Sequence, residues 1–191
     1  MNLKLLIIVL AVSMLSLVLQ FWQPELIYIR KEISQGDTWR ILTSQFVHTN
    51  WPHYLLNISS LWLFLFLFHT TVSFKSFIIN LFVLALSVGV CLHLLEPTIL
   101  WYAGLSGAIY GLYLIGAHTA LKINDYLLGI GTATLIIGKV CFDHWLGPIQ
   151  DNSQLIEARI VTEAHLYGVI AGLTLIAFDE ARNFVKSKLS N

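Results

Sequence analysis

Six long apolar blocks dominate the chain, and shorter polar segments separate them. Each block approaches the roughly 20 apolar residues that a helix needs to cross a bilayer. The blocks cover residues 3–21, 53–70, 74–95, 104–120, 126–143 and 160–178. This pattern predicts an all-α membrane protein with six transmembrane helices.

The first block has features of a secretory signal peptide, since Lys4 precedes an apolar run. However, the run is about as long as a full membrane span. The stretch from Ser16 to Trp22 offers no small-x-small cleavage site. We therefore expect the first block to be retained as a transmembrane helix.

Composition supports a membrane protein of one domain, covering residues 1–191. Of the 191 residues, 57% are hydrophobic and 12% charged, whereas soluble domains have about 25% charged residues. The net charge is zero, so nothing indicates a nucleic-acid partner. Cys91 and Cys141 both lie in apolar blocks, where small packing residues are expected rather than a disulfide framework.

The distribution of cations predicts the topology of the chain in the membrane. With a cytoplasmic N-terminus, six cations lie on the cytoplasmic side: Lys4, Lys75, Lys122, Arg182, Lys186 and Lys188. Four lie on the opposite side: Arg30, Lys31, Arg40 and Arg159. Because cytoplasmic segments are enriched in Lys and Arg, both termini are predicted to be cytoplasmic.

Two connections between the blocks are long, and both lie on the outer side in this topology. The first, about 22–52, contains Trp39-Arg40 among other aromatic and basic residues, which are typical of a segment in the headgroup region. The second, about 144–159, contains Gly147-Pro148 and a polar run over 150–154. Long loops tend to be functional, so we expect the chemistry to open toward the outer face.

Two glycine-rich blocks carry the most informative polar residues. Ser106 and Tyr110 are four residues apart, so they share one face of the fourth helix, and His165 lies on the sixth. Glycines surround both: Gly104, Gly107 and Gly111 near the serine, Gly168 and Gly172 after the histidine. Small residues let transmembrane helices approach closely, which could bring Ser106 to His165. A serine hydroxyl needs such an adjacent base to become a nucleophile.

His53 and Asn57 form a second polar pair, four residues apart at the start of the second helix. Both can donate hydrogen bonds from one face. A tetrahedral intermediate needs donors aimed at its oxyanion, and the Ser106 backbone N–H could add a third. Ordinary polar contacts between helices are the alternative interpretation of this pair.

Together these residues resemble the rhomboid family of intramembrane serine proteases. The matching residues are Trp39-Arg40, His48, His53-x-x-x-Asn57, Gly104-Leu105-Ser106-Gly107 with Tyr110, and Ala164-His165-x-x-Gly168-x-x-x-Gly172. The resemblance implies a six-transmembrane-helix rhomboid-like bundle with a Ser106–His165 dyad, no third acid and no cofactor. It also implies an oxyanion hole of His53, Asn57 and the Ser106 amide, with Tyr110 packed on His165.

Within the family, the chain is most similar to the rhombosortase branch. The stretch from Gly104 to Gly111 resembles the active-site segment of that branch, although a histidine is commonly expected where Tyr110 stands. Lys139 followed by an acid one turn later, here Asp143, is also similar. This resemblance implies a bacterial cell-membrane enzyme. Its substrates would be exported proteins that end in a Gly-Gly motif, an apolar span and a basic end.

Lys139 and Asp143 also stand out by themselves, because their spacing predicts an ion pair on one face of the fifth helix. The pair could hold that helix in place, or Lys139 could meet the substrate tail. His48 is expected to be a structural hydrogen-bonding residue in the first long connection. The sequence has no HExxH motif, so a zinc protease is not supported.

Three other functions stay open from the sequence alone. The chain could be a general rhomboid protease with other transmembrane substrates, or a rhomboid-like binder of membrane proteins without catalytic activity. Retention of both Ser106 and His165 argues against the binder. A small transporter is a further class, but no inverted repeat supports it.

Overall fold

Helices occupy all six predicted blocks in the computed structural model, which describes residues 3–147 and 150–189. They are α1 (Leu3–Leu19), α5 (Trp51–Phe68), α6 (Phe74–Leu95), α7 (Ser106–Lys122), α8 (Tyr126–Leu146) and α10 (Thr162–Leu189). Among the described residues, five helical segments are long and apolar enough to cross a membrane: Leu3–Leu26, which contains α1, and α5, α6, α8 and α10. The prediction of an all-α membrane bundle is confirmed.

Helices α1 and α7 are the shortest of the six, with 17 residues each, but α7 occupies the central position. It packs against α5, α6, α8 and α10, so four of the other five helices surround it. It begins at Ser106, two residues later than the predicted block, while α8 and α10 extend beyond their predicted ends to Leu146 and Leu189. The later start of α7 places Ser106 at the N-terminus of the helix rather than inside it.

Glycines allow α7 and α10 to approach almost backbone to backbone. A Cβ added at Gly168 would overlap the backbone of Gly107, and one at Gly172 would lie 2.9 Å from Cα of Gly111. A Cβ at Gly107 would lie 2.7 Å from the carbonyl oxygen of Ala164. The predicted close approach of these two helices is therefore confirmed, and no larger residue fits at the contact.

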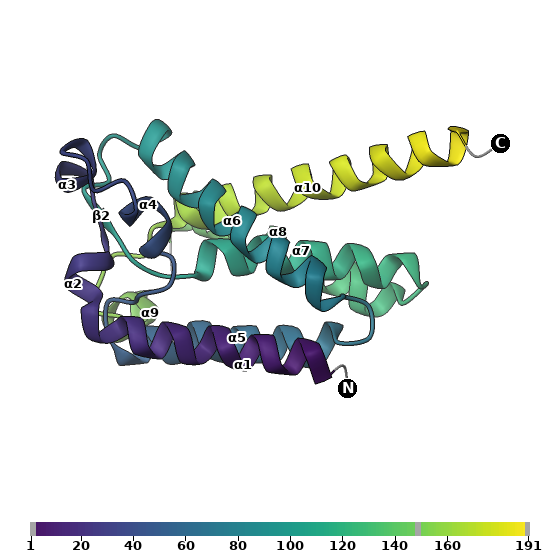
Figure 1. Cartoon of the computed structure of the whole chain (residues 1–191), viewed down its shortest axis with the longest axis horizontal. Helices are drawn as coiled ribbons and strands as arrows, with labels where there is room; N and C mark the ends of the chain where they lie inside the picture. Colours follow the sequence, from purple (N-terminus) through teal and green to yellow (C-terminus); the bar gives the residue numbers. More distant parts are fainter. Residues whose placement is uncertain (1–2, 148–149, 190–191) are drawn as a thin grey trace.

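Figure 1 shows where the connections lie: both long ones are at one end of the bundle, and both chain termini point to the other. The first connection contains η1 (Gln20–Trp22), α2 (Gln23–Leu26), β1 (Tyr28–Ile29), α3 (Arg30–Ser34) and α4 (Arg40–Thr43). Strand β1 pairs antiparallel with β2 (Trp101–Tyr102), which precedes α7, and Tyr28 faces Tyr102. The hydrophobic pattern did not predict this two-stranded sheet.

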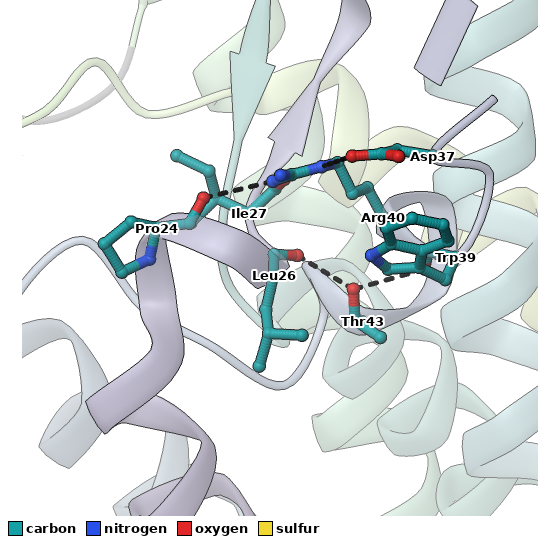
Figure 2. A network of polar contacts seen from close by, with 7 residues as sticks. All are labelled: Pro24, Leu26, Ile27, Asp37, Trp39, Arg40 and Thr43. Carbon is teal, nitrogen blue, oxygen red and sulfur yellow. Dashed lines mark hydrogen bonds and ion pairs between the residues drawn. The ribbon is translucent and has the colours of Figure 1, made fainter. Parts of the chain in front are cut away.

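Arg40 joins the parts of the first connection by hydrogen bonds (Figure 2). Its Nη1 donates to the carbonyl oxygens of Pro24 at 3.1 Å and Ile27 at 3.0 Å, and its Nε donates to the Asp37 carboxylate at 3.1 Å. Arg40 is only 8% exposed, whereas Trp39 is 51% exposed. The tryptophan suits the expected headgroup region, but the arginine is turned inward and crosslinks the loop.

Arg30 binds the C-terminal end of α6 in a similar way. Its guanidinium donates to the carbonyl oxygens of Leu92, His93, Glu96 and Ile99, at 2.7–2.9 Å. A cation is favourable at a helix C-terminus, where the last carbonyl groups have no partner within the helix. The interaction ties the first connection to the segment that leads into β2 and α7.

The second long connection contains α9 (Gln150–Leu155), which the sequence did not predict. Pro148, of the Gly147-Pro148 pair noted in this connection, lies outside the described residues. Thr49 Oγ1 donates to the carbonyl oxygen of Ile156 at 2.7 Å, and Asn50 Nδ2 donates to that of Leu155 at 3.0 Å. The two long connections therefore contact each other at the start of α5.

His48 is held in the first connection by its backbone. Its N–H donates to Gln20 Oε1 at 2.8 Å, and its carbonyl oxygen accepts from Gln20 Nε2 at 2.7 Å. The predicted structural role as a hydrogen-bonding residue holds for the backbone, but within the described residues the ring nitrogens have no partner. Burial, and then the proximity of His53, lower the pKa of the His48 ring from 6.5 to about 3.

Gly168→Ala is expected to destabilise the bundle because its methyl group would overlap the backbone of α7. Overpacking of this kind costs about 1–3 kcal/mol, and separation of α7 from α10 would add to it. Gly131→Ala is the matched control, since a Cβ at that position on α8 meets nothing within 4 Å. Thermal unfolding in detergent should show a lower Tm only for Gly168→Ala, and equal Tm values would contradict this packing.

His48 predicts a loss of stability in mild acid. The pKa of the His48 ring is lower in the folded protein than in the unfolded chain. Below pH 6.5 the unfolded chain therefore binds a proton that the folded protein does not bind, and this protonation favours unfolding. The free energy of unfolding is unaffected by protonation of His48 above pH 6.5 and decreases as the pH falls from 6.5 toward 3. The Tm of His48→Asn should therefore fall less steeply between pH 7 and pH 5 than that of the wild type. His144→Asn, at an exposed position, should keep the wild-type slope.

Candidate active site

Ser106 stands at the N-terminus of α7, directly after a constrained turn. Gly104 adopts φ = +129°, a conformation that disfavours other residues. Its N–H donates to the carbonyl oxygen of Ser44 at 2.9 Å, and its own carbonyl accepts from Tyr102 Oη at 2.7 Å. The first N–H groups of a helix have no partner within it and favour a negative charge nearby. Ser106 is thus placed where an oxyanion could be bound.

His165 lies in the first turn of α10, opposite Ser106. The distance from His165 Nε2 to Ser106 Oγ is 2.9 Å, within hydrogen-bonding range. The His165 ring stacks on Tyr110 with 4.3 Å between ring centroids and 5° between the planes. Three residues that the sequence singled out, Ser106, His165 and Tyr110, therefore lie together in the structure.

Asn57 and His53 project from α5 into the same site. The Asn57 side-chain amide donates one hydrogen bond to the His53 carbonyl oxygen at 3.0 Å. An amide group has two N–H donors, so a second remains for a ligand. Asn50 caps α5 by accepting from the His53 N–H at 2.9 Å. This cap fixes the first turn of α5, which carries His53.

The His53 ring contacts both Thr49 and the turn before Ser106. Its Nδ1 lies 3.1 Å from Thr49 Oγ1, and Thr49 donates its hydroxyl proton to Ile156. Thr49 can then only accept from His53, which places the ring proton on Nδ1. In that neutral tautomer Nε2 carries no proton. For His53 to donate from Nε2, Thr49 must turn its hydroxyl toward the ring.

A cavity of about 240 Å³ connects these groups. Ser106, His165, His53, Asn57 and Tyr110 all line it. Its other walls come from the segment before α7 and from the second long connection, and include Trp101, Tyr102, Ala103, Ile156, Ala158, Arg159, Ile160 and Val161. The cavity therefore lies where the two long connections meet, and Figure 1 shows these connections at one end of the bundle.

Lys139 and Asp143 form the predicted ion pair on α8, with the Lys139 ammonium on both carboxylate oxygens. The side chain of Asp143 is 1% exposed, and its Oδ2 lies 3.9 Å from His165 Nδ1. An acid beside the histidine was not expected, since the family resemblance implies none. The spacing of four residues predicted the ion pair between Lys139 and Asp143. It could not predict the contact with His165, because that contact depends on which helix this face of α8 packs against.

Within the described residues, no group of three or more His, Cys, Asp or Glu side chains converges as metal ligands would. The chemical groups present are a hydroxyl, an imidazole that can accept its proton, and N–H donors near the same point. Such a set can carry out acyl transfer.

Comparison with known proteins identifies the family of the chain. The family model for the Rhomboid domain matches residues 35–181, which is most of the chain. "Putative rhomboid protease YdcA" of Bacillus subtilis (strain 168) is 24% identical over 154 residues, covering 81% of this chain and 73% of that protein. This multi-pass membrane protein therefore belongs to the rhomboid family, whose proteases act on membrane-protein substrates within the bilayer.

Proposed function

We propose that this protein is an intramembrane serine protease in which Ser106 is the nucleophile and His165 the general base. The observation that carries the proposal is the 2.9 Å contact between Ser106 Oγ and His165 Nε2 at a helix N-terminus. Gly104, Gly107 and Gly168 support the site by shaping the turn and the close contact of α7 and α10. Tyr110 fixes the plane of the imidazole by stacking.

The reaction is peptide-bond hydrolysis in two steps. Ser106 Oγ attacks the scissile carbonyl carbon while His165 Nε2 takes the hydroxyl proton, and His165 then gives this proton to the leaving amine. A water molecule, deprotonated by His165, attacks the acyl-enzyme, and His165 returns that proton to Ser106 Oγ as the new carboxyl terminus leaves. The oxyanion formed in each step accepts hydrogen bonds from the Ser106 N–H, the second N–H of Asn57 and, after Thr49 reorients, His53.

The proposed substrates are exported proteins that end in a Gly-Gly motif, an apolar span and a basic tail. This finer assignment follows from the rhombosortase resemblance, and the charge pattern agrees with it. A substrate helix whose basic end stays in the cytoplasm presents its Gly-Gly motif at the outer face, where the proposed topology puts the cavity. Glycines also make local unwinding of a helix cheap, which exposes the scissile carbonyl.

In this proposal the protein resides in a bacterial cell membrane with both termini in the cytoplasm. Cleavage would release the exported passenger from its membrane anchor. No metal or cofactor takes part, because the hydroxyl, the imidazole and the N–H donors supply every group that the reaction needs.

Co-expression with a tagged passenger that carries this tail tests the proposal. Mass spectrometry should find a new C-terminus near the glycines with the wild type, and intact passenger with Ser106→Ala or His165→Ala. Cleavage of only a generic transmembrane substrate would leave a rhomboid protease with other substrates. A wild type that neither cleaves nor reacts with a fluorophosphonate would show a rhomboid-like binder, and activity retained in Ser106→Ala would refute the nucleophile.

Truncation of the oxyanion donors should slow turnover without abolishing it. Asn57→Ala and His53→Ala are each expected to lower kcat about 10²-fold, the effect of removing a single oxyanion donor. Ser60→Ala is the control: Ser60 also lines the cavity, but its hydroxyl bonds to the Leu56 carbonyl oxygen in its own helix. Rates for all three variants should be measured on the purified protein in liposomes. Equal kcat for Asn57→Ala and Ser60→Ala would rule out Asn57 as a donor.

A further inference from the structure

His165 Nδ1 is the one nitrogen of the proposed dyad whose hydrogen-bond partner is still to be identified. For Nε2 to accept the Ser106 proton, the neutral ring must carry its proton on Nδ1. This Nδ1 is buried, and within residues 3–147 and 150–189 it has no hydrogen-bond partner. A buried donor without an acceptor is costly, and nothing then favours the reactive tautomer over the other one.

Asp143 is the acceptor placed to fill this gap. Its Oδ2 lies 3.9 Å from His165 Nδ1, which is longer than a hydrogen bond but close enough for a small side-chain rotation to close. Catalytic hydrogen bonds are often long before substrate binds and shorten in the complex. The Asp143 side chain is buried, on a helix that packs against both α7 and α10.

We propose that Asp143 is a positioning residue for His165, so that the site works as a Ser106–His165–Asp143 triad. This inference rests on the proposed protease function. Asp143 Oδ2 accepts a hydrogen bond from Nδ1–H, which selects the tautomer with Nε2 free to take the Ser106 proton. When His165 becomes an imidazolium, the adjacent carboxylate stabilises its charge, and the Nδ1 proton stays on the ring.

Lys139 completes the arrangement by holding Asp143 in place. Its ammonium contacts both carboxylate oxygens from one turn earlier on α8, and its side chain is 34% exposed. Tyr110 fixes the plane of the imidazole from one side, and Asp143 fixes its rotation within that plane. Two independent contacts then orient His165 toward Ser106.

The simpler alternative is that the ion pair only holds α8 in the bundle. In that case the harm of Asp143→Ala comes from the unpaired Lys139 charge, and the double variant Lys139→Met/Asp143→Ala, which has neither charge, should recover activity. In the triad, the double variant still lacks the carboxylate and should stay slow. The two hypotheses therefore predict different activities for the double variant, in which no buried charge is left unpaired.

The experiment measures kcat, KM and Tm for the wild type, Asp143→Ala and the double variant, with a cleavable transmembrane substrate in liposomes. The triad predicts that kcat of the double variant falls about 10²-fold, within the range that positioned proton transfer contributes. Its KM should change less than about 2-fold and its Tm should stay near wild type, since no charge is left unpaired. Wild-type kcat in the double variant would overturn the proposal.

Two further measurements keep the proposal testable if the double variant does not fold. Asp143→Asn removes the charge and lets the side-chain amide donate to Nδ1, which favours the unreactive tautomer, so kcat should fall at least about 10²-fold. Nitrogen-15 NMR of histidine-labelled protein should show the His165 proton on Nδ1 in the wild type and a mixture of tautomers in Asp143→Ala. His165→Gln assigns the signal, and a tautomer independent of Asp143 would overturn the triad.

These readouts separate the two hypotheses. An active wild type with an unaffected double variant would keep the protease and remove the role of Asp143. An inactive wild type whose His165 tautomer still depends on Asp143 would remove the proposed function and keep the contact.

Discussion

The contact between α7 and α10 is the constraint on which the rest of the structure depends. Ser106 and His165 lie on different helices, and neither side chain is long. They can therefore meet only if the two helix backbones are close together. Only the near absence of side chains at Gly107, Gly168 and Gly172 lets the two backbones come close enough for a 2.9 Å contact between Oγ and Nε2. Helix α7 also packs against α5, α6 and α8, so this contact lies in the centre of the bundle.

The sequence predicted the parts of the molecule that depend on periodicity and spacing. Apolar blocks of membrane-spanning length are independent of the packing around them, so the helices were found nearly where they lie. Residues four apart share a helix face in any fold, so the pairing of Lys139 with Asp143 was also within reach.

Other features were beyond the sequence because they depend on which segments meet. The pairing of Tyr28 with Tyr102 joins segments far apart in the chain, and two residues per strand give no detectable alternation. An arginine beside a tryptophan is typical of a segment in the headgroup region. In the fold, however, Arg40 donates hydrogen bonds to the carbonyl oxygens of Pro24 and Ile27. The closeness of Asp143 to His165 likewise results from the packing of α8 on α10.

The buried polar atoms of the described residues show where stability gives way to function. Those without a hydrogen-bond partner belong to Ser44, Gln45, His48, Asn57, Glu163 and His165. They come from the end of the first connection and the starts of α5 and α10, which is the end of the bundle that carries the cavity. Unpartnered polar groups are costly in a membrane protein, and real proteins concentrate such violations at functional sites. Two of these residues, Asn57 and His165, also belong to the proposed site, so the end of the bundle that bears the cost of unpartnered polar groups is the end where we propose the chemistry takes place.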